Sequence, residues 1–210
     1  MNIIDLTHTV SGGMPVYPGD AQPRLTPLAS LERQGFRQLE LRMSTHTGTH
    51  VDAPAHLLPG GAALDAYPLS AFVGPALVLD GRLGEAPLLA ALDSPDARRA
   101  QFVFFYTGHS ALWGRPEYRT DWPAPSARLL RQLADRGVKG VGVDTLSVDA
   151  PDCAALDNHR LLLRAGILIF ENLTRLEQLL YRPFTFVGAP LKLPQADGAP
   201  VRALAIVGEL

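Results

Sequence analysis

The chain has 210 residues, of which 47% are hydrophobic and 19% charged, a composition typical of a folded domain with a large apolar core. Lysine and arginine number 19 against 21 for aspartate and glutamate, and the two signs are interspersed, which excludes a basic surface for nucleic acid or an anionic membrane. We therefore expect one domain over residues 1–210 that acts on a small molecule. The amino terminus lacks the pattern of a signal peptide and every apolar stretch is too short to span a bilayer, so we expect a cytoplasmic protein.

Apolar runs bounded by glycine, proline and aspartate predict eight strands, and short periodic patterns predict three helices. The clearest helix is the one in which Ser126 can cap the first turn, leucines form one stripe and Gly137 follows the last turn. Together these elements predict an α/β domain, with ordered loops at 12–20 and 58–61. In chain order the predictions are strands 3–6, 39–43 and 76–79, helix 87–92, strand 102–106, helix 127–136, strand 138–143, helix 157–164, and strands 167–170, 185–187 and 201–207.

Three histidines and an aspartate lie within eleven residues, at His46, His50, Asp52 and His56. The β-branched residues and glycine between them disfavour a helix. In an extended chain the four side chains project from one face, because their positions have the same parity. A straight strand would hold the α-carbons of His46 and His50 about 13 Å apart. That separation is too large for one ion, so we expect the chain to bend near Gly48, where glycine permits unusual backbone angles.

Imidazole and carboxylate groups without a thiolate suit zinc, manganese or ferrous iron and disfavour calcium and magnesium, and zinc is our first choice. The single cysteine, Cys153, excludes an internal disulfide and a cysteine-rich zinc site. We interpret it as a small buried residue without a role in the chemistry. The alternative is that the clustered histidines are unrelated core or surface residues, which their number and common parity disfavour.

The segment 46–56 resembles the signature His-x-Gly-Thr-His-x-Asp-x-Pro-x-His of the kynurenine formamidase and cyclase-like metal-dependent hydrolases, and it matches at every position. Segments 5–7, 15–20, 142–149 and 189–193 resemble the same family, so the likeness spans almost the whole chain. The resemblance implies a compact mixed β-sheet surrounded by short helices, of the swivelling β/β/α type. It also implies subunits that form a homodimer or homotetramer.

In that family His46, His50 and Asp52 would correspond to metal ligands, with Asp52 able to bridge two ions. The resemblance adds His159 and Glu171, a histidine and a glutamate twelve residues apart, as the second half of the site. Glu171 is unusual by itself, because it is a carboxylate directly after a predicted apolar strand. The resemblance thus implies a divalent metal centre, with two zinc ions per subunit and manganese as the alternative.

His56 would correspond to the catalytic acid or base of the family. It would move a proton from a metal-activated water to the leaving nitrogen of an amide. A role as a further ligand is the alternative, because His56 shares the face of the other three side chains. Pro54 redirects the chain before His56 and favours the acid–base role.

Four residues outside the motif are candidates for substrate contacts: Tyr17, His109, Trp113 and Ser147. His109 and Trp113 follow one predicted strand, and Ser147 follows another together with Asp144 and Asp149. For Ser147 and the two aspartates the alternative is equally supported, namely turn-forming residues that bond their own backbone. His8 is interpreted as a turn residue.

The resemblance implies hydrolysis of an amide bond, with an aryl formamide, N-formylkynurenine, as the leading substrate and kynurenine and formate as products. Formamidases of the family often carry tryptophan where this chain has Tyr17, and segment 107–114 looks more like that of general cyclase-like members. The reaction type is therefore better supported than the substrate. One alternative is hydrolysis of a cyclic amide or lactone, as by the isatin hydrolases. Another is a noncatalytic metal-binding module, which the intact His56 disfavours.

Overall fold

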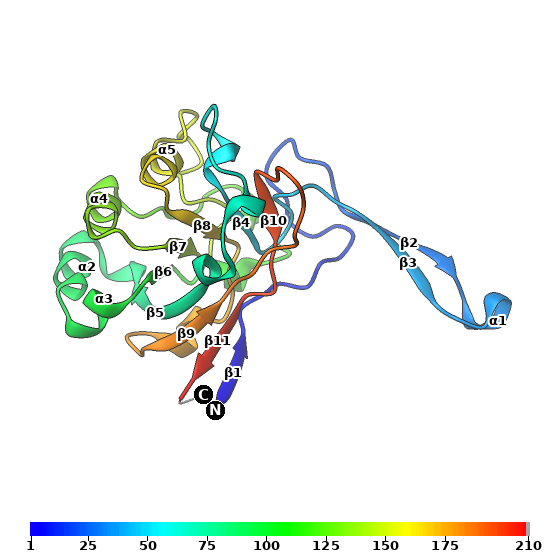
Figure 1. Ribbon diagram of the computed structural model, residues 1–210, viewed down its shortest axis with the longest axis horizontal. Helices are drawn as coiled ribbons and strands as arrows, with labels where there is room; N and C mark the ends of the chain where they lie inside the picture. Colours follow the sequence, from blue (N-terminus) through cyan, green and yellow to red (C-terminus); the bar gives the residue numbers. More distant parts are fainter. Residues whose placement is uncertain (209–210) are drawn as a thin grey trace.

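The computed structural model describes residues 1–208 and contains a nine-stranded mixed β-sheet with short helices against it (Figure 1). The central strands β5 to β8 run parallel to one another, and the strands at both ends pair antiparallel. The α/β prediction is confirmed. Across the sheet the strands are β1 (Asn2–Asp5), β11 (Leu204–Val207), β9 (Phe184–Val187), β5 (Val73–Asp80), β6 (Phe102–Tyr106), β7 (Gly140–Val143), β8 (Leu168–Glu171), β4 (His50–Asp52) and β10 (Gly198–Pro200).

Helices α2 (Glu85–Leu92), α3 (Pro95–Arg99), α4 (Ala127–Arg136) and α5 (Asp157–Arg164) gather beside the parallel strands (Figure 1). Successive residues of a strand point to opposite faces, so each central strand contributes to two cores. In β6, Val103 and Phe105 pack with the leucines of the helices, whereas Phe102 and Phe104 pack on the other side. Within residues 1–208 no helix combines the length and the apolar content that a membrane crossing requires.

Two of the three predicted helices have the predicted bounds. In α4 the Ser126 hydroxyl accepts the backbone N–H of Leu129, and Gly137 follows in the left-handed region, as expected. The bounds predicted for the helix at 157–164 also match those of α5. Helix α2 begins two residues earlier than predicted, and α3, one turn long, was not predicted.

Two strands next to the histidine-aspartate cluster were not predicted. Strands β4 and β10 have three residues each, too few to show an alternating pattern, and β10 includes a glycine and a proline. The strand predicted at 201–207 is shorter in the structure, because β11 begins at Leu204 and Val201 forms only an isolated bridge with Pro190. The resulting pairing of β4 with both β8 and β10 positions most of the site.

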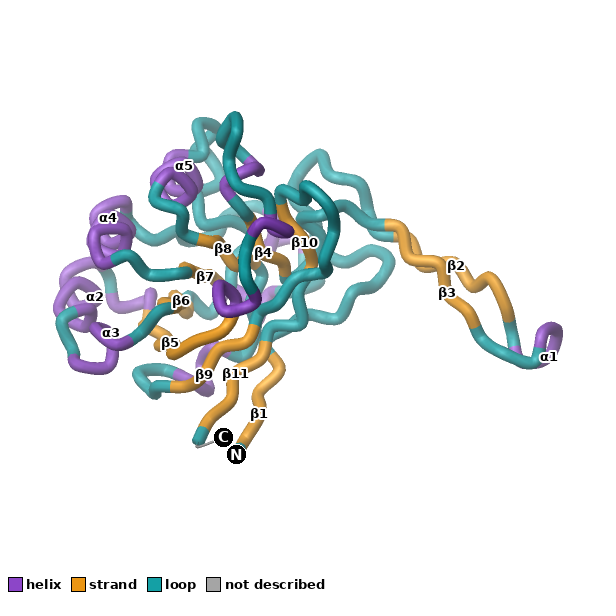
Figure 2. Tube along the Cα trace, in the orientation of Figure 1, coloured by secondary structure: helices purple, strands orange, loops and turns teal. Residues whose placement is uncertain are grey.

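Strand β3 (Gln38–Arg42) confirms the strand predicted at 39–43 but lies outside the main sheet. It pairs with β2 (Arg24–Ala29), which was not predicted, and α1 (Leu31–Gln34) lies at the tip of this hairpin. The hairpin, residues 24–42, extends away from the body of the molecule and is called the arm below (Figure 1). Long loops on both sides join the arm to β1 and β4 (Figure 2).

Candidate metal centre and active site

The chain bends at Gly48, as the spacing of the histidines predicts. Gly48 has a φ of +67°, in the left-handed region that glycine adopts without strain. A side chain there would also approach Met14, whose Cε lies 3.0 Å from the position of a Cβ. Beyond the bend, His50 and Asp52 lie on the buried strand β4, and the one-turn helix Pro54–His56 carries His56. The bend brings His46 back beside the strand, with its Nδ1 2.7 Å from Asp52 Oδ1.

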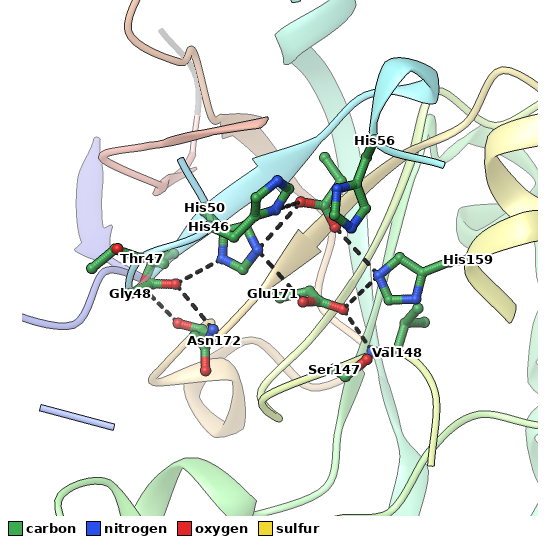
Figure 3. Close-up of polar contacts among 12 residues, drawn as sticks. His46, Thr47, Gly48, His50, His56, Ser147, Val148, His159, Glu171 and Asn172 are labelled. Carbon is green, nitrogen blue, oxygen red and sulfur yellow. Dashed lines mark hydrogen bonds and ion pairs between the residues drawn. The ribbon is translucent and has the colours of Figure 1, made fainter. Parts of the chain in front are cut away.

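The second half of the cluster comes from β8 and α5. Strand β8 runs antiparallel to β4 with Glu171 directly opposite His50. His159 projects from α5 toward the same point, so its Nε2 lies 3.3 Å from Glu171 Oε1 and 3.4 Å from Asp52 Oδ2. Figure 3 shows Glu171 between His50 and His159, which contact its two oxygens from opposite sides. The structure therefore brings together all five residues for which the resemblance implies metal binding.

Each of the three ligand-type histidines has one ring nitrogen held away from the cluster centre. His46 Nε2 donates to Asp197 Oδ2 at 2.9 Å, His50 Nδ1 to the Gly48 carbonyl at 2.8 Å, and His159 Nδ1 to Asp149 Oδ2 at 2.6 Å. The other nitrogen of each ring faces the carboxylates of the cluster. This is the arrangement in which metal-binding histidines are oriented in proteins, because the outer hydrogen bond fixes the ring and leaves the inner nitrogen to the cation.

Asp52 is at the centre of the arrangement. Among residues 1–208, three groups of ligand atoms are each compact enough to hold one cation. Two of them share Asp52, namely His46 with His50 and Asp52, and Asp52 with His159 and Glu171, and the third joins His46 to His56 and Asp197. Asp52 is completely buried, and within the described residues 1–208 its Oδ2 has no hydrogen-bond partner, only the ion-pair contact with His159 Nε2 at 3.4 Å. A buried carboxylate oxygen without a partner is costly unless a cation neutralises it. The residues present therefore fit a divalent metal centre in which Asp52 is shared.

Burial and charge act in opposite directions on the cluster. Burial disfavours charge on His46, yet hydrogen bonds and charge from Asp52 and Asp197 outweigh it and raise the His46 pKa to about 9. The pKa values of His50 and His159 are raised in the same way. Burial favours the neutral form of Asp52, but the surrounding histidines hold its pKa well below the usual range. The central carboxylate is therefore ionised, as metal binding requires, whereas the histidines would release their protons to a cation that binds.

His56 lies beside this cluster in a different electrostatic setting. Burial lowers its pKa, and Asp52 only partly offsets that effect. Its ring lies 4.1 Å from that of His46 and 6.0 Å from that of His159, between centroids. Its Nδ1 is 3.4 Å from Asp197 Oδ2, and the side chain borders a pocket, so a mainly neutral imidazole is available at the pocket wall. That protonation state suits a proton acceptor near neutral pH.

The pocket in front of the cluster has a volume of about 280 Å³ and is only partly polar. Tyr17 and Ser147, two of the predicted substrate contacts, line it. The other two do not appear among its lining residues within residues 1–208, because His109 Nε2 lies 3.0 Å from the Tyr118 carbonyl and Trp113 stacks on His8. Much of the apolar part of the wall comes from three leucines, Leu57, Leu146 and Leu156, with Pro15 and Val16 beside them.

The two aspartates left open by the sequence have different environments. Asp149 accepts the backbone N–H groups of Asn158 and His159 at the start of α5 and holds the His159 ring, so it orients a cluster residue. Asp144 is buried and accepts the backbone N–H groups of Thr107 and Gly108 in the loop after β6, so it stabilises a distant loop and does not bond its own backbone. Asp197, which contacts His46 and His56, was not predicted at all. No local signal marks it, because the contact joins residues more than 140 positions apart.

A family model described as a putative cyclase matches residues 4–150, more than half of the chain. This chain belongs to the cyclase family. Its cyclase-family relatives include kynurenine formamidases from Paracidovorax citrulli, 36% identical over 95% of this chain and 94% of the relative, and from Salinibacter ruber, 36% identical over 97% of both. The family resemblance inferred from the motif is thereby confirmed.

Solved structures of the family show the same fold. Isatin hydrolase A from Labrenzia aggregata bound to benzyl benzoate superposes with a TM-score of 0.86 at 30% identity, covering 99% of this chain and 94% of that one. A predicted metal-dependent hydrolase from Bacillus stearothermophilus superposes with a TM-score of 0.78 at 31% identity over 97% of both chains. With the ligand clusters described above, this chain is a cyclase-family metal-dependent hydrolase.

Proposed function

We propose that this protein hydrolyses the amide bond of an aryl formamide of the N-formylkynurenine type, giving the aryl amine and formate. The observation that carries the proposal is Asp52 shared between two ligand clusters, with the acid–base candidate His56 beside them at the wall of a pocket. The relatives named kynurenine formamidase support the substrate class, since they match almost the whole chain.

We propose that His46, His50, Asp52, His159 and Glu171 hold the metal, with Asp52 between two ions. Zinc is our first choice and manganese the alternative, since the donors are imidazole nitrogens and carboxylate oxygens. Divalent cations held there would supply an acidified water and a positive charge next to the carbonyl oxygen of the substrate.

His56 carries the proton in this proposal. Its Nδ1 faces Asp197, so Nε2 is the nitrogen left to accept a proton from the attacking water. The water oxygen bonds to the formyl carbon, the carbon–nitrogen bond breaks, and the proton passes from His56 to the leaving nitrogen. The leucine side chains of the pocket wall would contact the aromatic ring of the substrate and exclude bulk water.

The test is an assay of purified protein loaded with zinc, and separately with manganese, on N-formylkynurenine, simple aryl formamides and isatin. Release of formate from the formamides is the expected result. Isatin ring opening without formamide turnover would transfer the proposal to the cyclic amide class, which the similarity to isatin hydrolase A favours. Full metal occupancy without turnover on the whole panel would contradict hydrolysis and favour a metal-binding module.

We further infer that the protein assembles with a second copy of itself through the arm, as a homodimer or homotetramer. One face of the arm is apolar, since Leu25 lies opposite Leu41 and Pro27 opposite Leu39, and both strands are exposed. A two-stranded hairpin without a covered face is marginally stable in water. The arm holds four arginines and two glutamates in a chain of net charge −2, so the rest of the molecule is acidic and complements it.

A further inference from the structure

Asp197 is held by two groups other than the two histidines that it contacts. Its carbonyl oxygen accepts the backbone N–H of Ala53 at 2.8 Å, and its Oδ1 accepts the Thr45 hydroxyl at 3.1 Å. The next residue begins β10, which pairs with Asp52 through Gly198. Both the backbone and one carboxylate oxygen are therefore fixed, and the remaining oxygen, Oδ2, has a defined position.

That remaining oxygen serves both histidines. His46 Nε2 lies 2.9 Å and His56 Nδ1 3.4 Å from Asp197 Oδ2. The two rings approach to 4.1 Å between centroids, with a tilt of 39°. An anionic oxygen to which both rings can donate stabilises this close approach. It also determines which nitrogen of each ring is left to bind a metal or to transfer a proton.

The segment that carries Asp197 approaches His46 too closely for a side chain at the next position. A Cβ at Gly198 would lie 2.6 Å from Cε1 of the His46 ring. The absence of a side chain there allows the backbone to pass against the ring. The geometry therefore depends on glycine directly after the aspartate.

We propose that Asp197 is a positioning residue that orients the metal ligand His46 and the acid–base residue His56 at the same time. This inference rests on the proposed function, because it assigns the two histidines their roles there. By accepting from His46 Nε2, Asp197 turns Nδ1 toward Asp52. By accepting from His56 Nδ1, it leaves Nε2 for proton transfer. One carboxylate thus couples ligand geometry to proton transfer.

The experiment compares Asp197→Asn with the wild type in two measurements. Zinc affinity, measured by chelator competition, should fall about 10- to 100-fold, the usual result of removing an outer partner of a histidine ligand. At saturating zinc, kcat should also fall about 10-fold or more while KM changes little, because the group acts through His56 on the chemical step. Asp65→Asn is the matched control. Asp65 is an exposed aspartate near the same segment, because the backbone N–H of its neighbour Leu64 donates to the carbonyl of Ala196, the residue before Asp197.

A double-mutant cycle tests the route through His56. In a His56→Ala background, Asp197→Asn should cause no further loss of kcat at saturating zinc, because the group it orients is gone. A further loss as large as in the wild-type background would overturn that half of the proposal. Thr45→Val, which keeps the charge of Asp197 and removes its anchor, should weaken zinc binding in the same direction but less.

The measurement of zinc affinity does not depend on turnover. If the wild type hydrolyses nothing on the panel, the proposed function fails, and unchanged zinc affinity in Asp197→Asn would then also overturn the positioning of His46. Reduced zinc affinity would support it even so. Loss of one zinc equivalent from Asp197→Asn at saturating zinc would make Asp197 a ligand together with His46 and His56 and would overturn the proposal.

Discussion

The arm and strand β4 carry similar alternating patterns but have opposite environments. In the arm, Leu39 and Leu41 alternate with polar residues and all of β3 is exposed. In β4, His50 and Asp52 flank Val51 and all three are buried. Nothing in residues 1–208 covers the strands of the arm. The polar side chains of β4, in contrast, are buried because each has charged or hydrogen-bonding neighbours. Alternation thus predicts which residues share a face and leaves open what covers that face.

The largest effect should follow removal of a side chain from the buried strand. His50→Ala should lose bound metal, and its turnover should fall to the level of metal-free protein, because Asp52 and Glu171 lose their shared histidine. Elemental analysis after gel filtration, together with the formamide assay, measures both effects. Metal content equal to that of the wild type would contradict the role of β4 as the ligand strand.

A smaller effect should follow His56→Ala. This variant should keep its metal and lose about 10²- to 10⁴-fold in turnover, the usual contribution of a general acid–base group. The comparison with His50→Ala is decisive, because both histidines border the same pocket. Equal metal depletion in the two variants would mean that His56 is a ligand.

The arm should respond to a change on its apolar face and not on its polar face. Leu41→Lys should raise the dissociation constant of the assembly at least about 10-fold, since it places an unpaired charge in an apolar contact. Thr26 lies on the other face, opposite Glu40, so Thr26→Lys should leave the mass of the assembly unchanged. Analytical ultracentrifugation over a range of concentrations measures this. A monomeric wild type, or equal behaviour of the two variants, would contradict assembly through the arm.

The smallest predicted effect concerns His8, which stacks on Trp113 outside both regions. Burial lowers the His8 pKa to about 4, below its ordinary 6.5, with a smaller contribution from Arg175. As the pH falls, His8 is therefore protonated in the unfolded chain before it is protonated in the folded protein. The free energy of unfolding decreases as a result between pH 6.5 and about 4.

His8→Phe keeps an aromatic ring on Trp113 and removes this titration. Between pH 7.5 and pH 5 its free energy of unfolding should fall about 1–2 kcal/mol less than that of the wild type. Urea unfolding at the two pH values measures the difference, and the wild type serves as the control for every other titrating group. Equal losses in the two proteins would show that the pKa of His8 does not differ between the folded and unfolded states.

Local chemistry explains which parts of the site could be predicted. The cluster from His46 to His56 was visible because its residues are close in sequence and share parity, and the bend at Gly48 followed from the distance that a straight strand would impose. His159 depended on the family resemblance. Asp197 could not be found, because its contacts arise only when β10 pairs with β4, and β10 is too short to be predicted. Of the arm, only the strand at 39–43 was predicted, and its projection from the molecule was not, since no residue pattern encodes what lies above an apolar face.

The direct opposition of His50 and Glu171 across β4 and β8 makes the centre sensitive to strand register. Side chains alternate along a strand, so a slip of one residue would place Val51 against Glu171 and turn both His50 and Asp52 to the reverse side of the sheet. The ligand set is therefore complete only when this antiparallel pairing has formed correctly. A cation that binds here selects one alignment among those that an apolar sheet could adopt, and chelation should lower the thermal stability of the main sheet and not only its activity.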